Sequence, residues 1–416
     1  MRVLLLTHGS RGDVQPFLAL ARGLAERGHR PRLAGPARSA ALAAAHGIPF
    51  HPLDDASLDL QDLVAQKGTR AALTAARTVK PLLRRMLDTA ATAIRDEEAD
   101  LVVHHPKALA GPHLAEALGV PAITATLLPL YVPTSEFPLP MLPARAVPAP
   151  LARPSWRLVA AIDAPYRGLL RAWRRDVLDL PARSRTTFMT TPDGGPAPVP
   201  LHAWSRHLLP APADWPKAAR PLGYWLAPAP ETWVPPAPLR EFLDAGEPPV
   251  YLGFGSMVGR DPAGLARTVL DAVRRSGRRA VLATGWGGLR PGDSPRDSPG
   301  DDVLVLDQVP HDWLFPRCAA VVHHGGAGTV AAAARAGRPQ VIRPMLADQP
   351  FWAGRVHGLG LGPAPLARRV DAGRLAAALT GVGDAALVER CRAMGEALRA
   401  EDGVAAAVDR LEHLAG

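Results

Sequence analysis

The stretch His323-His324-Gly325-Gly326-Ala327-Gly328-Thr329 follows the apolar run Ala320–His323 and precedes an alanine-rich run that ends at Gly337. These runs predict a buried strand followed by a helix. A glycine-rich turn at such a junction lets backbone N–H groups approach a phosphate, and the helix N-terminus favours negative charge. Thr329 can cap the helix or donate to phosphate, and His324 can donate to the same oxygens. We therefore expect a phosphate-binding turn; the alternative is a tight turn around a buried histidine pair.

Strands and helices alternate on both sides of this unit. The strands expected in the first half are Val3–Thr7, Arg32–Ala34, Gly47–Phe50, Leu101–His104 and Ala122–Ala125. Those expected in the second half are Pro249–Phe254, Ala280–Thr284, Val303–Leu306, Ala320–His323 and Gln340–Arg343. The alternation predicts an α/β protein with doubly wound parallel sheets, and ligands of such folds bind at the carboxyl ends of the strands.

A proline-rich segment separates the two halves of the chain. Its repeated Ala-Pro and Pro-Pro pairs are typical of a semi-rigid linker. We expect a first, acceptor-binding domain at 1–227, a linker at 228–240 and a second, nucleotide-sugar-binding domain at 241–400. A final helix at 401–416 is expected to pack back onto the first domain. The binding site should lie in the cleft between the domains.

The composition of the chain indicates which kinds of partner and which cellular compartment to expect. The 416 residues carry a formal charge of +9, but the basic residues are spread along the chain beside Asp and Glu. No dense basic run is interleaved with aromatic residues, so we expect no nucleic-acid partner; contact with an anionic membrane surface stays open. Cys318 and Cys391 have no disulfide or metal-ligand pattern. Without a signal or membrane-spanning segment, a cytoplasmic protein is expected, and the Arg, Ala and Pro bias suggests a GC-rich bacterium.

Five motifs in order along the chain resemble glycosyltransferase family 1, whose members have the two-domain GT-B fold. They are Gly9–Pro16, Pro310–Pro316, His323–Thr329, Arg335–Pro339 and Asp348–Ala353. The resemblance is strongest to the sterol 3-β-glucosyltransferases and the bacterial antibiotic glycosyltransferases. It reaches from end to end of the chain but is weak between about Leu139 and Pro248.

This resemblance implies a nucleotide-sugar donor and a set of residues that bind it. The set comprises Ser10, Arg11, Gly12, Ser256, Val309, Trp313, His324, Gly326, Ala327, Gly328, Thr329, Asp348 and Gln349. His324, Ser256 and the glycine turn would hold the diphosphate, while the backbone at Val309, supported by Trp313, would pair with the base. The carboxylate and amide at 348–349 would grip neighbouring sugar hydroxyls, which favours an unreduced hexose such as glucose.

The resemblance also implies a catalytic base in the first glycine turn. Some relatives carry a histidine three residues before the proline of this turn, whereas this chain has Asp13 before Pro16. Asp13 would take the proton of the acceptor hydroxyl, which typically contributes ~10²–10⁴ in rate. A structural alternative is that Asp13 caps a helix starting at Val14, and both roles can coexist. His8 is the second candidate base.

An apolar segment after the fifth expected strand resembles the acceptor region of the sterol branch. Leu127, Phe137 and Pro138 are the acceptor-binding candidates. The aromatic residues Trp156, Tyr166 and Trp173 either cover the same cleft or belong to the core. The resemblance fits a lipophilic acceptor with a hydroxyl group, either sterol-like or a polycyclic or macrocyclic natural product.

The acidic pairs Asp54-Asp55 and Asp301-Asp302 lack a third ligand nearby, so we expect neither a metal nor another cofactor. The expected activity is inverting, metal-independent transfer of a hexose, glucose from UDP-glucose. The alternatives are a TDP-deoxysugar donor, a sugar-nucleotide epimerase or lipid-intermediate transferase, or a catalytically silent relative acting as a partner or activator. The oligomeric state is left open.

Overall fold

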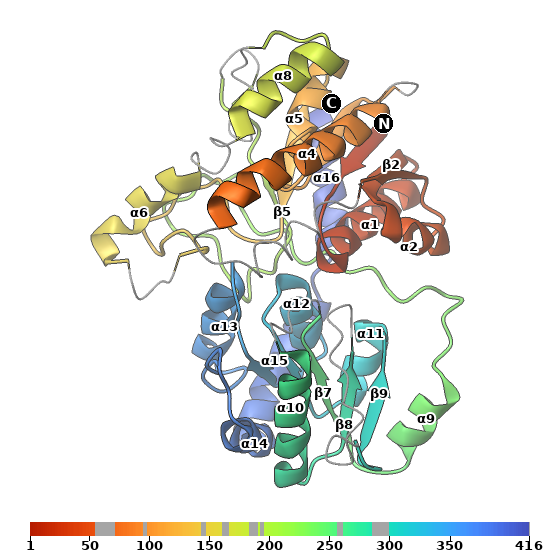
Figure 1. Ribbon diagram of the computed structural model, residues 1–416, viewed down its shortest axis with the longest axis vertical. Coiled ribbons are helices and arrows are strands. Elements are labelled where there is room, and N and C mark those ends of the chain that lie inside the picture. Colours follow the sequence, from red (N-terminus) through yellow and green to blue (C-terminus); the bar gives the residue numbers. More distant parts are fainter. Residues whose placement is uncertain are drawn as a thin grey trace.

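A computed structural model describes residues 1–54, 71–94, 98–142, 147–159, 166–182, 190–191, 195–255, 261–284 and 299–415 of the chain. In this part of the chain, two parallel sheets lie one above the other, each flanked by helices (Figure 1). The predicted pair of doubly wound α/β sheets is therefore confirmed.

The first sheet has the strand order β3-β2-β1-β4-β5-β6 with parallel pairing throughout. Its strands are β1 Arg2–Leu6, β2 Arg30–Pro36, β3 Phe50–Leu53, β4 Leu101–His104, β5 Ala122–Thr126 and β6 Leu201–His202. The helices of this half are α1 Arg11–Glu26, α2 Ala40–Ala45, α4 Ala71–Thr92, α5 Gly111–Leu118, α6 Ala152–Ser155 and α8 Arg167–Val177. Short 3₁₀ turns occur at Ala37–Ser39, Ala149–Leu151 and Trp156–Leu158.

The second sheet has the order β11-β10-β7-β8-β9, again parallel. Its strands are β7 Val250–Gly253, β8 Ala280–Ala283, β9 Val303–Leu306, β10 Ala320–His323 and β11 Gln340–Ile342. The helices are α9 Ala237–Asp244, α10 Pro262–Ser276, α11 His311–Leu314, α12 Ala327–Arg335, α13 Gln349–Gly358, α14 Ala372–Gly381, α15 Ala385–Arg399 and α16 Gly403–Ala415; a 3₁₀ turn spans Phe315–Arg317.

Apolar runs that are buried on both faces form the central strands, as parallel sheets covered by helices require. Every residue of β4, β7, β8 and β10 is buried. On α1, Phe17, Leu18 and Leu24 recur at helical spacing and pack into the core of the first sheet.

The final helix, α16, returns to the first sheet. Ala407, Val408 and Leu411 are buried in the same core as α1, against which α16 packs. Arg27, which follows α1, forms ion pairs with Asp409 at 2.9 Å and Glu412 at 2.7 Å. The segment predicted as a linker, 228–240, contacts the second domain, because the Ala229 N–H donates to the Asp312 carboxylate at 2.7 Å. Helix α9 begins within this segment, at Ala237.

Several predicted boundaries differ from the observed ones for local reasons. The expectation that Asp13 caps a helix starting at Val14 is wrong, because α1 begins at Arg11 and Ser10 is its N-cap. The third strand starts at Phe50 because Gly47 still belongs to the end of α2, its N–H bonding to the Ala44 carbonyl. Strand β6 was not predicted, since two residues carry no periodic signal.

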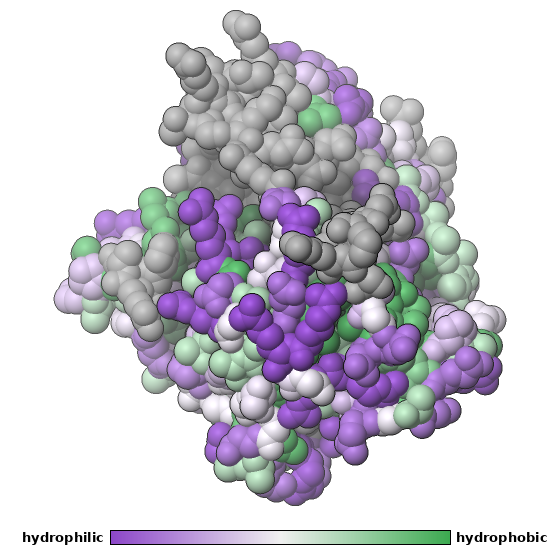
Figure 2. All heavy atoms as spheres, turned by 60° about the horizontal axis from the view of Figure 1, so that its bottom comes forward, coloured by the Kyte–Doolittle hydropathy of each residue, from purple (hydrophilic) through white to green (hydrophobic). Residues whose placement is uncertain are grey.

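Within the described ranges, no helix is both long and apolar enough to cross a membrane. Hydrophilic side chains are spread among hydrophobic ones over the face of the molecule that Figure 2 shows. Part of the basic surplus is also paired locally, as where Arg392 bridges Glu389 and Glu396 on α15.

Candidate functional site

The two glycine turns singled out in the sequence meet between the sheets. One follows β1 and opens α1, and the other follows β10 and opens α12. A Cβ placed on Gly328 would lie 3.9 Å from the Cα of Gly12, so the two helix N-termini approach each other closely. Arg11 reaches across and donates to the side chain of Gln308 at 2.7 Å. Figure 1 shows α12 directly below the first sheet.

The paired histidines of the second turn have different surroundings. His323 is fully buried; its Nδ1 accepts from the Gly325 N–H at 3.1 Å and its Nε2 lies 3.0 Å from the Gln340 side-chain oxygen. Since Nδ1 accepts, the hydrogen of the neutral ring is on Nε2 and is donated to Gln340. His323 is therefore a structural residue that fixes the shape of the turn.

His324 has a buried polar atom beside Gly255, the residue that ends the described part of the turn after β7. Its Nδ1 is buried and has no hydrogen-bond partner in the described part of the chain, and a Cβ on Gly255 would lie 3.9 Å from it. A buried polar atom of this kind is costly unless a ligand satisfies it. Burial lowers the pKa of His324 to about 4, so the ring is neutral at pH 7. It can therefore donate a hydrogen bond to a phosphate but contributes no charge.

The glycine residue next in the turn is required for space. A Cβ on Gly326, the N-cap of α12, would lie 2.6 Å from Nε2 of His324, closer than non-bonded atoms approach. Ala327, in the first turn of α12, packs against the core of the first sheet. Gly328 and Thr329 follow it in the same turn, and both are half-buried. The turn thus places the α12 N-terminus beside the first domain.

Asp13 lies in the first turn of α1 with its carboxylate held by several donors. Its Oδ2 accepts from the N–H of Ser10 at 2.8 Å and from the Ser10 hydroxyl at 3.0 Å. The ammonium of Lys107 contacts Oδ1 at 2.8 Å and Oδ2 at 2.9 Å. The Asp13 side chain is 13% exposed, so it is largely but not wholly enclosed.

These contacts determine the charge of Asp13. Burial alone raises the pKa of the carboxyl group, but the charge of Lys107, with His105 and the Ser10 hydrogen bond, outweighs it and brings the pKa below its usual value. Asp13 is therefore ionised at neutral pH and can accept a proton. His8, the second candidate base, is buried, and burial lowers its pKa to about 4.

His105 orients the same carboxylate from the loop after β4. Its Nδ1 accepts the N–H of Lys107 at 3.1 Å, so the neutral ring carries its hydrogen on Nε2. That nitrogen faces Oδ1 of Asp13 at 3.7 Å, which is longer than a hydrogen bond. Burial lowers the pKa of His105 to about 4.

Asp348 and Gln349, the residues predicted for the sugar hydroxyls, sit at the start of α13. The side-chain oxygen of Gln349 accepts from the N–H groups of Met345 (2.7 Å) and Leu346 (3.1 Å). These bonds hold a loop in which Ala347 has φ +56°, a conformation that a Cβ disfavours. The side-chain NH₂ of Gln349 has no hydrogen-bond partner in the described part of the chain, so it can bind a ligand. Burial raises the pKa of Asp348, whose carboxylate also feels the charges of Lys107 and Asp13.

Of the residues predicted to contact the nucleobase of the donor, Val309 lies just before α11 and Trp313 lies within it. Val309 is buried at 9% exposure, and Trp313 is half-buried. Trp313 packs edge-on against Trp233 of the linker at 5.2 Å between ring centres, with the Arg317 guanidinium 4.2 Å above its ring. Ser256 lies outside the described residues.

The acceptor candidates divide between core and interface. Leu127 is buried in the core of the first sheet, so it offers no open surface. Phe137 is half-buried, as is its neighbour Pro138, and its ring meets Phe351 of α13 at 5.3 Å and Trp156 at 6.0 Å. Trp173 is fully buried in another cluster with β4 and α4, which supports its interpretation as core.

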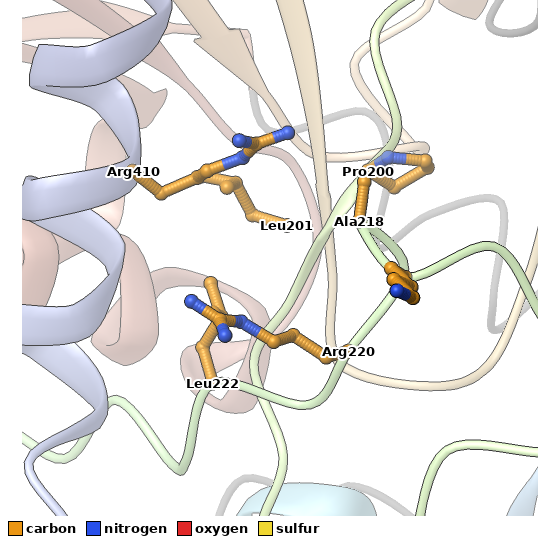
Figure 3. A pocket seen from close by; sticks show the side chains of 7 residues that line it. Pro200, Leu201, Ala218, Arg220, Leu222 and Arg410 are labelled. Atoms are coloured by element: carbon orange, nitrogen blue, oxygen red, sulfur yellow. The ribbon is translucent and has the colours of Figure 1, made fainter.

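A pocket at the outer edge of the first sheet is not part of this site. It is lined by Pro200, Leu201, Lys217, Ala218, Arg220, Leu222 and Arg410 (Figure 3). It lies between β6, the segment after it and α16, and it contains none of the residues predicted for donor or acceptor.

Sequence reasoning missed Lys107, His105 and Gln308. A signal was available for the first two, because they directly follow β4, the neighbour of β1, and the carboxyl ends of adjacent parallel strands share one edge. Gln308 precedes Val309 in a loop, and its contact with Arg11 depends on how the domains meet.

Two family models match the chain. Residues 3–135 match the glycosyltransferase family 28 N-terminal domain, and residues 294–414 match the erythromycin biosynthesis protein CIII-like C-terminal domain. Each match contains one of the glycine turns described above.

Among curated proteins, the chain is 35% identical to sterol 3-beta-glucosyltransferase UGT80A2 of Arabidopsis thaliana over 98% of its length, and 33% identical to UGT80B1 of the same plant. It spans 64% and 67% of these two relatives. The sterol 3-beta-glucosyltransferase of Emericella nidulans is 34% identical over 99% of the chain, which spans 30% of that protein. These relatives are eukaryotic.

Solved structures confirm the GT-B architecture. The glycosyltransferase VinC in complex with DTDP is similar with a TM-score of 0.69 at 22% identity, covering 100% of this chain and 99% of its own. The glycotransferase of kitacinnamycin gives 0.68 at 23% identity with the same coverage. With its fold and its relatives established, the chain has the GT-B fold and belongs to the glycosyltransferase family that includes the sterol 3-beta-glucosyltransferases.

Proposed function

We propose that this protein transfers glucose from UDP-glucose to a hydroxyl group of a lipophilic small molecule, with inversion at the anomeric carbon and without a metal ion. The observation that carries the proposal is the approach of the two glycine turns. It places an ionised carboxylate, Asp13, on one side and a helix N-terminus with an unsatisfied histidine nitrogen on the other. A base and an anion-binding group facing each other are what displacement of a diphosphate needs.

The donor diphosphate is proposed to lie at the N-terminus of α12. The helix dipole and the free N–H groups of its first turn favour negative charge there. His324 adds a hydrogen bond from Nδ1, an atom that has no other partner among the described residues. As the sugar leaves, charge builds up on the diphosphate, and these donors are already in place to stabilise it.

The transfer is a single displacement. The acceptor oxygen forms a bond to the anomeric carbon from the face opposite the diphosphate, while the bond between that carbon and the diphosphate oxygen breaks. The hydroxyl proton passes to Asp13, and the electron pair of the broken bond leaves with UDP. One displacement inverts the anomeric configuration, and Asp348 and the free NH₂ of Gln349 bind sugar hydroxyls during it.

A sterol-like acceptor is favoured by the relatives, whose names specify sterols, although the chain spans about two thirds or less of their lengths. The half-buried rings of Phe137 and Phe351, which meet at 5.3 Å, supply aromatic surface for such a molecule, and buried Trp156 supports Phe137 from behind. A polycyclic or macrocyclic natural product presents similar chemistry, so the acceptor class is decided by experiment.

The test is incubation with UDP-glucose and a mixed pool of sterols, flavonoids and macrolides in the presence of EDTA, followed by mass spectrometry. Gain of one hexose by a pool member supports the donor, the metal independence and the acceptor class together. If product forms only with TDP-glucose or only with added Mg²⁺, the proposed donor or metal independence is wrong. No product under any of these conditions favours a specialised deoxysugar donor or a silent partner protein.

A further inference from the structure

Lys107 lies at the same edge of the first sheet as the proposed base, and none of the sequence motifs described above contains it. It reaches Asp13 from the loop after β4, with its ammonium at 2.8 and 2.9 Å from the two carboxylate oxygens. Its side chain is 44% exposed, whereas that of Asp13 is 13% exposed. The lysine thus lies at the solvent-facing edge of a largely buried carboxylate.

The two oxygens of this carboxylate are not equivalent. Oδ2 accepts three hydrogen bonds, from the Ser10 N–H, the Ser10 hydroxyl and Lys107. Within the described residues, Oδ1 accepts a hydrogen bond from Lys107 alone, and Nε2 of His105 lies 3.7 Å away, beyond hydrogen-bond distance. A carboxylate oxygen has about two lone-pair directions, so Oδ1 retains acceptor capacity and Oδ2 does not.

We propose that Lys107 is a positioning residue that fixes the Asp13 carboxylate so that Oδ1 faces the acceptor hydroxyl. This rests on the proposed role of Asp13 as the base. With Oδ2 held by Ser10 and Lys107, the carboxylate cannot rotate without breaking several bonds. During transfer, the acceptor O–H bond breaks and a new O–H bond forms at Oδ1. Lys107 holds the carboxylate in place and takes no part in these bond changes.

The space taken by the Asp13–Lys107 ion pair explains why residue 9 is a glycine. Gly9 has φ +117°, and a Cβ there would run into Oδ2 of Asp13 and lie 3.1 Å from the Lys107 ammonium. The ion pair therefore fills the position that a side chain at this residue would take. The backbone turn after β1 and the loop after β4 are shaped around it.

The pH dependence follows from the charged groups around Asp13. Lys107 and His105 face it from the β4 loop, His8 lies in the turn before α1, and Asp348 contributes from the second domain. Burial keeps both histidines neutral at pH 7. Lys107 is therefore the main positive charge on the carboxylate, and its removal brings the pKa of Asp13 up.

The experiment compares wild type with Lys107→Met, Lys107→Arg and Asp13→Asn, with Lys80→Met on the exposed face of α4 as the matched control. Rates with UDP-glucose and a productive acceptor are measured across pH. We expect K107M to lower kcat by up to about a hundredfold through misplacement of the base. Its KM for UDP-glucose should change little, and the acid limb of the kcat profile should move to higher pH. K107R should recover part of the loss, and K80M should match wild type.

A second readout does not need turnover. The protein is labelled with ¹³C at the aspartate carboxyl carbon, and the Asp13 signal is assigned by its loss in D13N. Followed from about pH 8 down to about pH 5, where the fold still holds, this signal should begin to titrate in K107M while it keeps its ionised position in wild type and K80M.

The outcomes separate the two proposals. If K107M keeps wild-type kcat and an unmoved acid limb, or if its Asp13 signal titrates as in wild type, the role of Lys107 is overturned. If D13N is fully active, Asp13 is not the catalytic base, and the role proposed for Lys107 falls with it. If no donor and acceptor pair turns over, the proposed function fails, and the carboxyl titration still decides whether Lys107 controls Asp13.

Discussion

Burial decides the charge of the histidine residues closest to the reacting groups. His324 and His105 each have a pKa lowered to about 4 by loss of hydration, far below the value of about 6.5 for an exposed imidazole. Each contributes N–H groups and shape but no positive charge at pH 7. The charged side chains at the site are Asp13, Lys107, Asp348 and Arg11, and the dipole of α12 adds partial positive charge.

Because His324 is neutral at pH 7, we expect the affinity for the donor not to depend on pH near neutrality. The Kd of UDP-glucose, whose diphosphate does not titrate near neutrality, should stay constant from pH 6 to pH 8 when measured by calorimetry. His324→Ala should raise it about 10- to 100-fold, the worth of one hydrogen bond to a charged group. His324→Gln retains an N–H donor and should recover part of the affinity. Wild-type affinity that weakens as pH rises through 6.5 would show a charged imidazolium instead.

Two strand–turn–helix units, β1–α1 and β10–α12, bring the proposed base and the proposed phosphate-binding turn close to each other. The turn into α12 leaves no room for a side chain at its N-cap, whereas α13 contains Gly354, beside which nothing lies within 4 Å of an added Cβ. These two glycine residues form a matched pair for substitution.

Gly326→Ala should displace His324, because the added Cβ would lie 2.6 Å from its Nε2. We expect weaker UDP-glucose binding and a lower melting temperature. Gly354→Ala, in a helix interior with free space, should raise stability by about 0.5–1 kcal/mol and leave binding unchanged. Thermal unfolding and calorimetry on both variants test this; equal donor affinity in G326A and wild type would contradict the described turn.

The elements were predictable where the pattern is strong. Strands β4, β9 and β10 lie at their predicted residues because each is a short apolar run bounded by polar residues or turns. The α1 boundary was missed because its cap, Ser10, lies within the glycine turn, where helical periodicity has not begun. Strand β6, with two residues, is defined by its neighbour β5 and not by its own sequence.

The site was predictable only in part, because some of its contacts join residues that are far apart in the sequence. Family motifs pointed to Asp13 and the α12 turn, which the structure brings together, although their roles stay predictions. Lys107 and Gln308 act through contacts that span 94 and 297 residues of sequence, and no local pattern encodes those. The carbonyl of the Gln349 amide is likewise engaged by the backbone of its own loop, a use that its position in a motif does not reveal.

At the scale of the whole molecule, buried histidines link stability to acidity. Eight have pKa values lowered to about 3 or 4: His8, His104, His105, His113, His202, His311, His323 and His324. Burial is the first cause for each. The unfolded chain binds their protons near pH 6.5, whereas the folded chain binds them near pH 4 or below.

Between these values the unfolded state holds more protons, so stability rises with pH and is complete above about pH 6.5. On acidification toward pH 4 each group should remove up to about 1.4 kcal/mol per pH unit. Calorimetry in this window should show a steep fall of the melting temperature. A melting temperature that stays level from pH 6.5 to pH 4.5 would show that these rings are not buried and neutral.

The sharpest test of Asp13 as the catalytic base compares the turnover of Asp13→Asn with its affinity for the donor. The substitution keeps the shape of the side chain and removes its basicity, so kcat should fall by ~10²–10⁴. The affinity for UDP-glucose should remain that of wild type, because the proposed diphosphate site is on α12. A D13N protein that transfers glucose at the wild-type rate would contradict the account.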